Sequence, residues 1–173
     1  MSTYVEISDL SLNIAFRSIS RRWGAIRTGL NFGFDFYLEG KSSTSDISIT
    51  SQKILKVSNF DVKINYMGND NQEVYLGKLI AKKPTISLKS NMKTKIVFKL
   101  DLTFAELKQL EELKESTNIR FLTDFIFSSE TKIDSKNKTM HKARLEFNVS
   151  KSTWVEALHS RLRYANRPVF TST

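Results

Sequence analysis

Hydrophobic and polar residues alternate along most of this chain. The clearest stretch covers residues 30–38, where every second position is leucine or phenylalanine and the positions between them are Asn, Gly, Asp and Tyr. Successive side chains of a β-strand point to opposite faces, so this pattern predicts a strand with one buried face. The same alternation recurs over residues 10–16, 60–66, 74–76, 96–102, 119–127 and 143–149. Strands are therefore expected to make up most of the fold.

Two interruptions of the alternation predict changes of chain direction or register. Val5 and Ile7 are in opposite phase to Leu10 and Leu12, which predicts a bulge or break near residues 8–9, because a one-residue slip exchanges the two faces. Residues 67–71, Met-Gly-Asn-Asp-Asn, have the composition of a turn, and apolar alternation resumes after them. Residues 57–80 are therefore predicted to form a hairpin.

Two segments carry the helical pattern instead. Thr103-Phe-Ala-Glu106 reads as a capping box, and an apolar face spaced by about three residues continues to Leu113. Thr153-Trp-Val-Glu156 reads as a second capping box. It is followed by an apolar stripe at four-residue spacing, and Pro168 prevents the helix from continuing. One short inserted helix and one C-terminal helix are expected.

These elements predict the fold class. Roughly seven to nine strands without a regular β-α-β rhythm favour an all-β fold, an antiparallel two-layer sandwich. The short helix is inserted between the strands ending at Leu102 and beginning at Ile119. A barrel is the alternative. The chain is expected to be a single domain spanning residues 1–173, with residues 150–173 as a helical C-terminal appendage.

The composition limits the kinds of site that the chain can form and the compartment in which it is expected. A chain of 173 residues with 40% hydrophobic residues can build one continuous core. The sequence has no cysteine, which excludes a disulfide framework, a thiolate metal site and a cysteine nucleophile, and suits a reducing compartment. No apolar run approaches the roughly 20 residues needed to cross a bilayer, and the first residues lack the basic-then-apolar order of a signal peptide. We expect a protein of the cytoplasm, or of a particle assembled inside a cell, with no membrane partner.

The sequence offers little for catalysis. Its two histidines, His141 and His159, have no carboxylate at metal-ligand spacing around them. There is no Gly-x-Ser-x-Gly elbow and no glycine pattern for binding phosphate. Spacing leaves a Ser–His–Asp set open, because the members of a triad meet only in the fold. We expect no enzyme activity, no cofactor and no metal, and we identify no small-molecule substrate.

Positive charge is concentrated in a few segments. The formal net charge is +9, and residues 78–99 contain seven lysines and no acid. Lysines on the wet face of a strand keep a protein soluble and block edge pairing, which is the favoured interpretation here. A broad lysine surface without interleaved aromatics would otherwise give weak, salt-sensitive attraction to nucleic acid.

Arginines and a tryptophan gather between the first two clear strands. The residues concerned are Arg17, Arg21, Arg22, Trp23 and Arg27. Arginine forks beside an aromatic suit phosphate contact with base stacking, and they equally suit a protein interface anchored by the tryptophan. A third interpretation is a loop whose tryptophan covers one end of the sandwich while its arginines are solvated. All three remain open at this stage.

The C-terminal helix and tail form a second candidate binding segment. It contains Trp154, Arg161, Arg163, Tyr164 and Arg167. Cations near a helix C-terminus are favoured by the helix dipole, which explains part of the pattern. The favoured interpretation is a helix docked on its own sheet. The alternative is a helix or tail that reaches into a neighbouring subunit.

Part of the chain resembles a known architecture. The alternating strand over residues 57–66, Leu102-Thr-Phe-Ala-Glu-Leu107 at the start of a helix, and Ser152-Thr-Trp-Val-Glu-Ala-Leu158 after the last strand occur in a similar order in one group of proteins. From Phe60 onward the chain resembles the late-embryogenesis-type and fibronectin-like sandwich domains of prokaryotic proteins. The resemblance implies a non-catalytic binding or scaffold module and no site residues to carry over.

Two hypotheses follow. The first is a non-enzymatic protein-interaction or assembly module that uses the two arginine-and-aromatic segments to bind a protein partner or a second copy of itself. The second is a basic nucleic-acid-binding protein, suggested by the charge of +9 and by residues 17–27.

Overall fold

A computed structural model describes residues 3–7, 10–20, 25–26, 29–42, 54–89, 92–114, 117–131 and 138–166; at 3–7, 10–11, 20, 25–26, 41–42, 131 and 160–166 it describes the backbone alone. The ten strands in this part of the chain are β1 (Thr3–Ile7), β2 (Leu10–Ser20), β3 (Ala25–Ile26), β4 (Gly29–Ser42), β5 (Ile54–Met67), β6 (Glu73–Ala81), β7 (Thr85–Lys89), β8 (Lys93–Thr103), β9 (Asn118–Thr131) and β10 (Thr139–Ser150). The helices are α1 (Phe104–Glu111), α2 (Lys151–Asn166) and a 3-10 turn, η2 (Asn69–Asn71).

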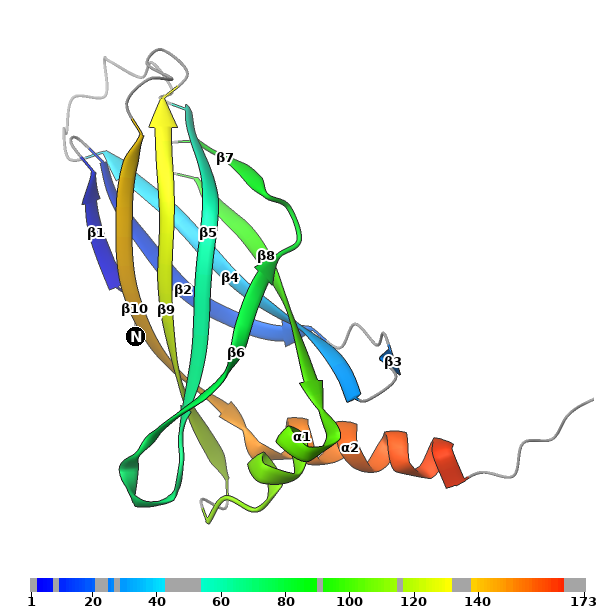
Figure 1. Ribbon diagram of the computed structural model, residues 1–173. Coiled ribbons are helices and arrows are strands. Elements are labelled where there is room, and N and C mark those ends of the chain that lie inside the picture. The colour runs from blue at the N-terminus through cyan, green and yellow to red at the C-terminus, as the bar shows by residue number, and fades with distance from the viewer. Residues whose placement is uncertain are drawn as a thin grey trace, which may run out of the picture.

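The strands form one antiparallel sheet that folds over into two layers (Figure 1). Its order is β1-β2-β4-β8-β6-β5-β9-β10, with β3 paired to β4 and β7 paired to β5. One layer contains β1, β2, β4 and β8, and the other contains β5, β9 and β10 with β7 at its margin. Strand β6 joins the layers, and β1 lies beside β10 at the opposite margin, so the sheet almost closes. The expected all-β, antiparallel two-layer fold is confirmed, with closure approaching the barrel alternative.

Of the two predicted interruptions, the structure describes the hairpin over residues 57–80. Strands β1 and β2 pair antiparallel, with Ile7 opposite Leu10; the bulge or break predicted near residues 8–9 lies outside the described residues and stays a prediction. The hairpin predicted over residues 57–80 is formed by β5 and β6, with η2 in its turn. Asp70 and Asn71 adopt positive φ angles there, which Asn and Asp tolerate better than most residues.

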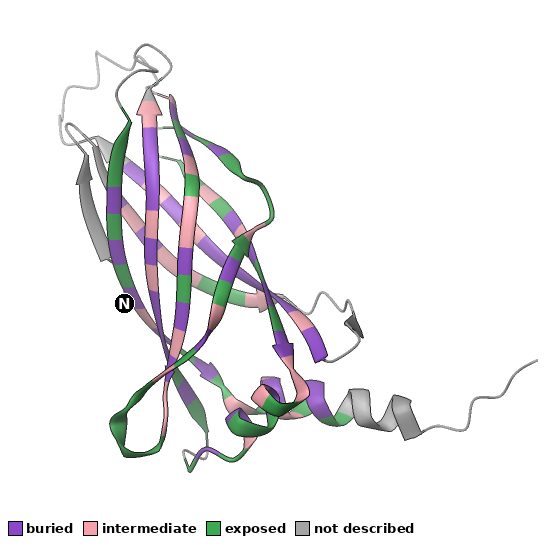
Figure 2. Cartoon of the chain, in the orientation of Figure 1, coloured by how far each residue is buried: buried purple, intermediate pink, exposed green. Residues whose placement is uncertain are grey.

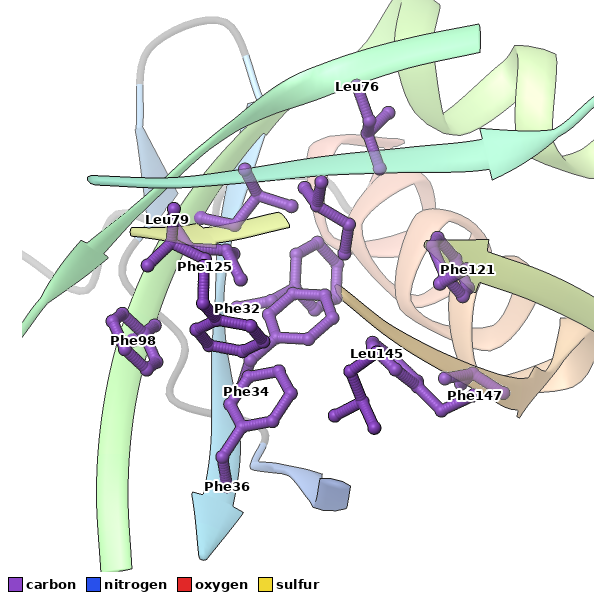
Figure 3. Packing of buried hydrophobic residues seen from close by; sticks show 14 of the residues in the cluster. Phe32, Phe34, Phe36, Leu76, Leu79, Phe98, Phe121, Phe125, Leu145 and Phe147 are labelled. Carbon is purple, nitrogen blue, oxygen red and sulfur yellow. The ribbon is translucent and has the colours of Figure 1, made fainter. Parts of the chain in front are cut away.

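The alternation in sequence becomes alternation in burial, which Figure 2 shows along each strand. The inward rows of β4, β8, β9 and β10 meet in one core, and Figure 3 shows phenylalanine rings from all four strands packed together. Phe36 is fully buried and makes edge-to-face contacts with Phe98, Phe125 and Phe147 at centroid distances of 5.7, 5.1 and 5.7 Å. Such pairs add about 0.5–1.5 kcal/mol each beyond the area they bury.

The inserted helix begins as the sequence predicts. Thr103 is the N-cap of α1, its hydroxyl accepts from the Glu106 amide at 3.2 Å, and the Glu106 carboxylate accepts from the Thr103 amide at 3.3 Å. Leu107 and Leu110 are buried beneath the helix. Since a helix of this length is marginal alone, the cap and this packing hold it in place.

The second predicted capping box is wrong. Helix α2 begins at Lys151, so Thr153 already lies in its first turn and does not cap it. Strand β10 runs directly into the helix: the Lys151 amide donates to the Thr117 carbonyl at 2.8 Å, and the Lys151 ammonium donates to the Leu113 carbonyl at 2.6 Å. A helix capped by Thr153 would begin at Trp154, and these contacts fix its start three residues earlier, at Lys151.

Candidate binding site

The lysine-rich segment lies along an open seam of the sandwich. Residues 78–99 contribute the end of β6, the bend at residues 82–84, β7 and the first part of β8. A cleft of about 520 Å³ lies between β7 and β8. It is lined by Lys82, Lys83, Thr85, Ile86, Ser87, Thr94, Lys95, Ile96 and Val97. We call this feature the lysine cleft. Its volume is within the range of about 300–1,000 Å³ typical of ligand sites.

The cleft is open because β6, which pairs with the second edge of β8, ends before it reaches residues 93–96 of β8. Strand β8 pairs with β4 from Lys93 to Thr103, but its other edge pairs with β6 only at Phe98 and Lys99. After Ala81 the chain bends and crosses to the other layer, where β7 pairs with β5 (Figure 1). Pro84 lies in this bend and cannot donate a backbone hydrogen bond. Among the described residues, no strand pairs with the second edge of β8 over residues 93–96.

One hydrogen bond settles which backbone groups face the cleft. The Lys82 amide donates to the Val97 carbonyl at 2.9 Å, so the polar groups of Val97 point away from β4. In an antiparallel ladder, alternate residues direct their N–H and C=O groups to the same neighbour. Lys95 and Lys93 therefore direct theirs toward the cleft, whereas Thr94 and Ile96 bond to β4. The lysine cleft presents a short, unpaired strand edge.

The lining combines positive charge with an apolar floor. Lys82, Lys83 and Lys95 are exposed, and no acidic side chain lines the cleft within the part of the chain that the structure describes. Ile86 and Ile96 are buried and form its inner wall. On the outer face of the sheet, the Lys95 ammonium lies 3.9 Å from the Asp35 carboxylate. The cleft therefore suits a ligand that carries both negative charge and apolar groups.

The first predicted arginine segment is described only at its beginning. Arg17 is the extra residue of a bulge between β2 and β4, and its guanidinium lies 5.2 Å from the centre of the Tyr37 ring on the outer face. Arg21, Arg22, Trp23 and Arg27 lie outside the described residues. The three interpretations of this segment therefore remain predictions.

In the second predicted segment, the C-terminal helix and tail, Trp154 belongs to the core and the remaining candidate residues lie further along the chain. Trp154 is fully buried and packs on Phe32, Phe34 and Phe121 at ring distances of 4.8, 6.1 and 5.6 Å. It holds α2 on the end of the sandwich and offers no surface to a partner. Helix α2 also meets α1, where His159 lies 3.4 Å from Glu111. The backbone of α2 carries Arg161, Arg163 and Tyr164 beyond this contact, and Arg167 lies outside the described residues.

A buried histidine–serine pair lies between β9 and β10. His141 Nε2 is 2.8 Å from the Ser129 hydroxyl, and both residues are almost fully buried. Burial lowers the pKa of His141, so the ring is neutral in the folded protein at neutral pH. The pair is buried in the core, and the His141 ring lies 5.2 Å from the Phe127 ring. In the described part of the chain, no group of three or more potential ligands is arranged to hold a metal ion.

The sequence interpretation missed the lysine cleft as a site. Its signal was the acid-free run of lysines interrupted by Pro84, with hydroxyl residues at 85 and 87 in the opposite phase to Ile86 and Leu88. Those features predict two strands and a bend. Whether the two strands pair with each other or leave a cleft between them depends on which strands they pair with, and the sequence does not specify those partners.

Comparison with known proteins gives only distant similarity. No family model matches the chain, and no curated protein matches it. A protein from Archaeoglobus fulgidus has a similar structure with 12% identity and a TM-score of 0.39, covering 79% of this chain and 97% of its own. AT1g01470 from Arabidopsis thaliana has 10% identity and a TM-score of 0.37, covering 86% and 80%.

A candidate late embryogenesis abundant (LEA) protein, At2g46140.1, has 10% identity and a TM-score of 0.40, covering 80% of this chain and 70% of its own. These neighbours confirm the expected resemblance to late-embryogenesis-type sandwich domains as a weak likeness, and function must be argued from the site itself. The described residues contain no helix long and apolar enough to span a membrane.

Proposed function

We propose that this chain is a non-enzymatic protein-interaction module whose partner binds at the lysine cleft through an acidic surface. The observation that carries the proposal is the coincidence of an unpaired strand edge with lysines on both sides of it. Unpaired backbone groups bind another chain readily, and complementary charge steers the encounter and selects the partner. We place this activity in the cytoplasm, or in a particle assembled inside a cell, on the basis of the cysteine-free sequence.

A protein partner fits the cleft better than nucleic acid does. Proteins that bind single strands combine a basic groove with aromatic side chains on which bases stack. The cleft lining contains lysines, hydroxyl residues and aliphatic residues and no aromatic ring. Nucleic acid remains the alternative partner, with its support in the net charge of +9 and in Arg17 and the segment that follows it.

The test compares two triple variants of equal charge. One replaces Lys82, Lys83 and Lys95 with Gln, and the control replaces Lys63, Lys138 and Lys142, exposed lysines outside the cleft. Because exposed ion pairs contribute about 0.2–1 kcal/mol each, the cleft variant should bind the partner roughly ten-fold more weakly. The control should bind like the wild type, as measured by affinity capture from source cells followed by titration of the recovered protein.

Two outcomes would contradict the proposal. If nuclease treatment abolishes capture, and binding to DNA or RNA falls steeply with salt, the nucleic-acid alternative is correct. If both triple variants lose binding equally, the lysine cleft is not the site and general charge explains the attraction.

A further inference from the structure

We infer that the partner segment is an extended acidic chain that adds to the free edge of β8 as a short antiparallel strand, in line with β6. The inference rests on the proposed function and specifies the chemistry of its partner. The inference follows from the unpaired backbone groups of β8 that face the lysine cleft, and the lysine charges alone would not require strand addition.

The free edge offers a defined set of hydrogen bonds. Lys93 and Lys95 each direct one N–H and one C=O toward the cleft, as the Lys82–Val97 bond requires. Side-chain charge does not satisfy these groups, and an added strand does. The edge is bounded by the bend at residue 82 and by the turn between β7 and β8, so the added strand is short.

The direction of the added strand follows from β6. Strand β6 runs antiparallel to β8 and pairs at Ile80 and Ala81, and Lys82 makes the last bond before the chain bends away. A partner chain that enters beside Lys82 continues the same line and meets Lys95 first and Lys93 second. Antiparallel pairing is also slightly more stable per residue than parallel pairing.

The two faces of the added strand meet different surroundings. Residues opposite Lys95 and Lys93 point to the outer face beside the two ammonium groups, because directly paired residues share a face. The residue between them points inward, toward Ile86 and Ile96. The site therefore selects a segment in which acidic and apolar residues alternate.

Edge lysines make this selection strict. A neutral apolar strand that paired here would take lysine ammonium groups out of water without compensation, whereas a carboxylate supplies the opposite charge. The lysines thus block indiscriminate pairing and admit one chemical class of strand.

The test uses capped, fluorescent peptides with the full-length protein. Glu-Val-Glu-Val-Glu should bind, and Lys-Val-Lys-Val-Lys should not. Two isomers of the acidic peptide carry one N-methyl group each, on the central Glu or on the following Val. Because Lys82 already occupies the position opposite Val97, the first Glu lies opposite Lys95 and the central Glu opposite Lys93. The amide of the central Glu therefore faces the Lys93 carbonyl, so methylation there should weaken binding roughly ten-fold, whereas methylation of the Val amide should leave it nearly unchanged.

Hydrogen exchange of the backbone amides of β8 provides a second, independent measurement. Saturation with the acidic peptide should slow exchange of the Lys93 and Lys95 amides, while the Thr94 and Ile96 amides, already bonded to β4, should change little. Equal binding of both methylated peptides would overturn strand addition, and equal loss would overturn the assigned register. In either case the proposed function stands if the partner still distinguishes the two triple lysine variants.

Discussion

Trp154 allows a quantitative test of how α2 is attached. Its indole is fully buried against three phenylalanine rings, and its Nε1 atom has no hydrogen-bond partner among the described residues. Replacing such a residue with Ala costs about 3–5 kcal/mol, and the ring contacts place W154A toward the upper end of that range. For a chain of this size, that loss corresponds to a fall in Tm of roughly 10–15 °C.

Replacing Trp154 with Phe separates packing from polarity. The smaller ring gives up two carbon atoms at about 0.8 kcal/mol each, which amounts to about 1.6 kcal/mol of lost burial. It also removes the unpaired N–H group, and leaving such a donor buried costs about 1–3 kcal/mol. The two effects nearly cancel, so W154F should have a free energy of unfolding within about 1 kcal/mol of the wild type.

Equilibrium urea unfolding, followed by tryptophan fluorescence and circular dichroism, measures these changes. Tyr75→Ala is the matched control, because Tyr75 is 59% exposed and surface substitutions change stability by about 0.5 kcal/mol or less. A cost below about 2 kcal/mol for W154A would refute the docking of α2 by this side chain. An equal cost for W154F and W154A would refute the role assigned to the unpaired N–H group.

Three further predictions test the fold. Burial lowers the pKa of His141, so the unfolded chain protonates this imidazole more readily than the folded protein does. The free energy of unfolding should therefore fall as the pH drops below about 6.5. Unfolding measured between pH 5 and 7.5 should show a weaker pH dependence in H141Q than in the wild type. Gly29→Ala should cost about 3 kcal/mol, because its Cβ would overlap the Leu102 carbonyl, while Gly40→Ala meets only flexible leucine side chains and should cost less in the same denaturant assay. Thr103→Ala removes the cap of α1 and should cost about 1 kcal/mol, and Thr103→Ser should restore most of it.

The sequence predicts the strands and the core well because both depend on local periodicity. The row from Leu30 to Leu38 is buried as its alternation requires, and the Thr103 cap lies where the motif predicts it. Contacts distant in sequence are predicted poorly. Trp154 shows the spacing of a helix stripe whether it faces a partner or its own core, and only the positions of Phe32, Phe34 and Phe121 decide between the two.

The lysine cleft is missed for the same reason. Seven lysines over residues 78–99 appear as the solvated face of ordinary strands, and several of them are exposed as that interpretation requires. Their arrangement around a free edge depends on β6 leaving β8 after Ala81 and on β7 pairing with β5 instead. Pairing choices of this kind are set by the whole sheet and leave only a weak trace, the bend at Pro84, in the sequence.

The same lysines should also keep copies of this chain apart. If two free β8 edges paired antiparallel, Lys93 and Lys95 of one copy would lie against the same lysines of the other, and like charges directly opposite destabilise a strand pair. Removing the cleft charges in the Lys82, Lys83 and Lys95 triple variant should therefore increase self-association in sedimentation at high protein concentration. The Lys63, Lys138 and Lys142 control carries the same net charge and should behave like the wild type. A wild-type dimer that the cleft variant dissolves would show that the edge serves self-assembly, and would contradict selection of an acidic partner strand.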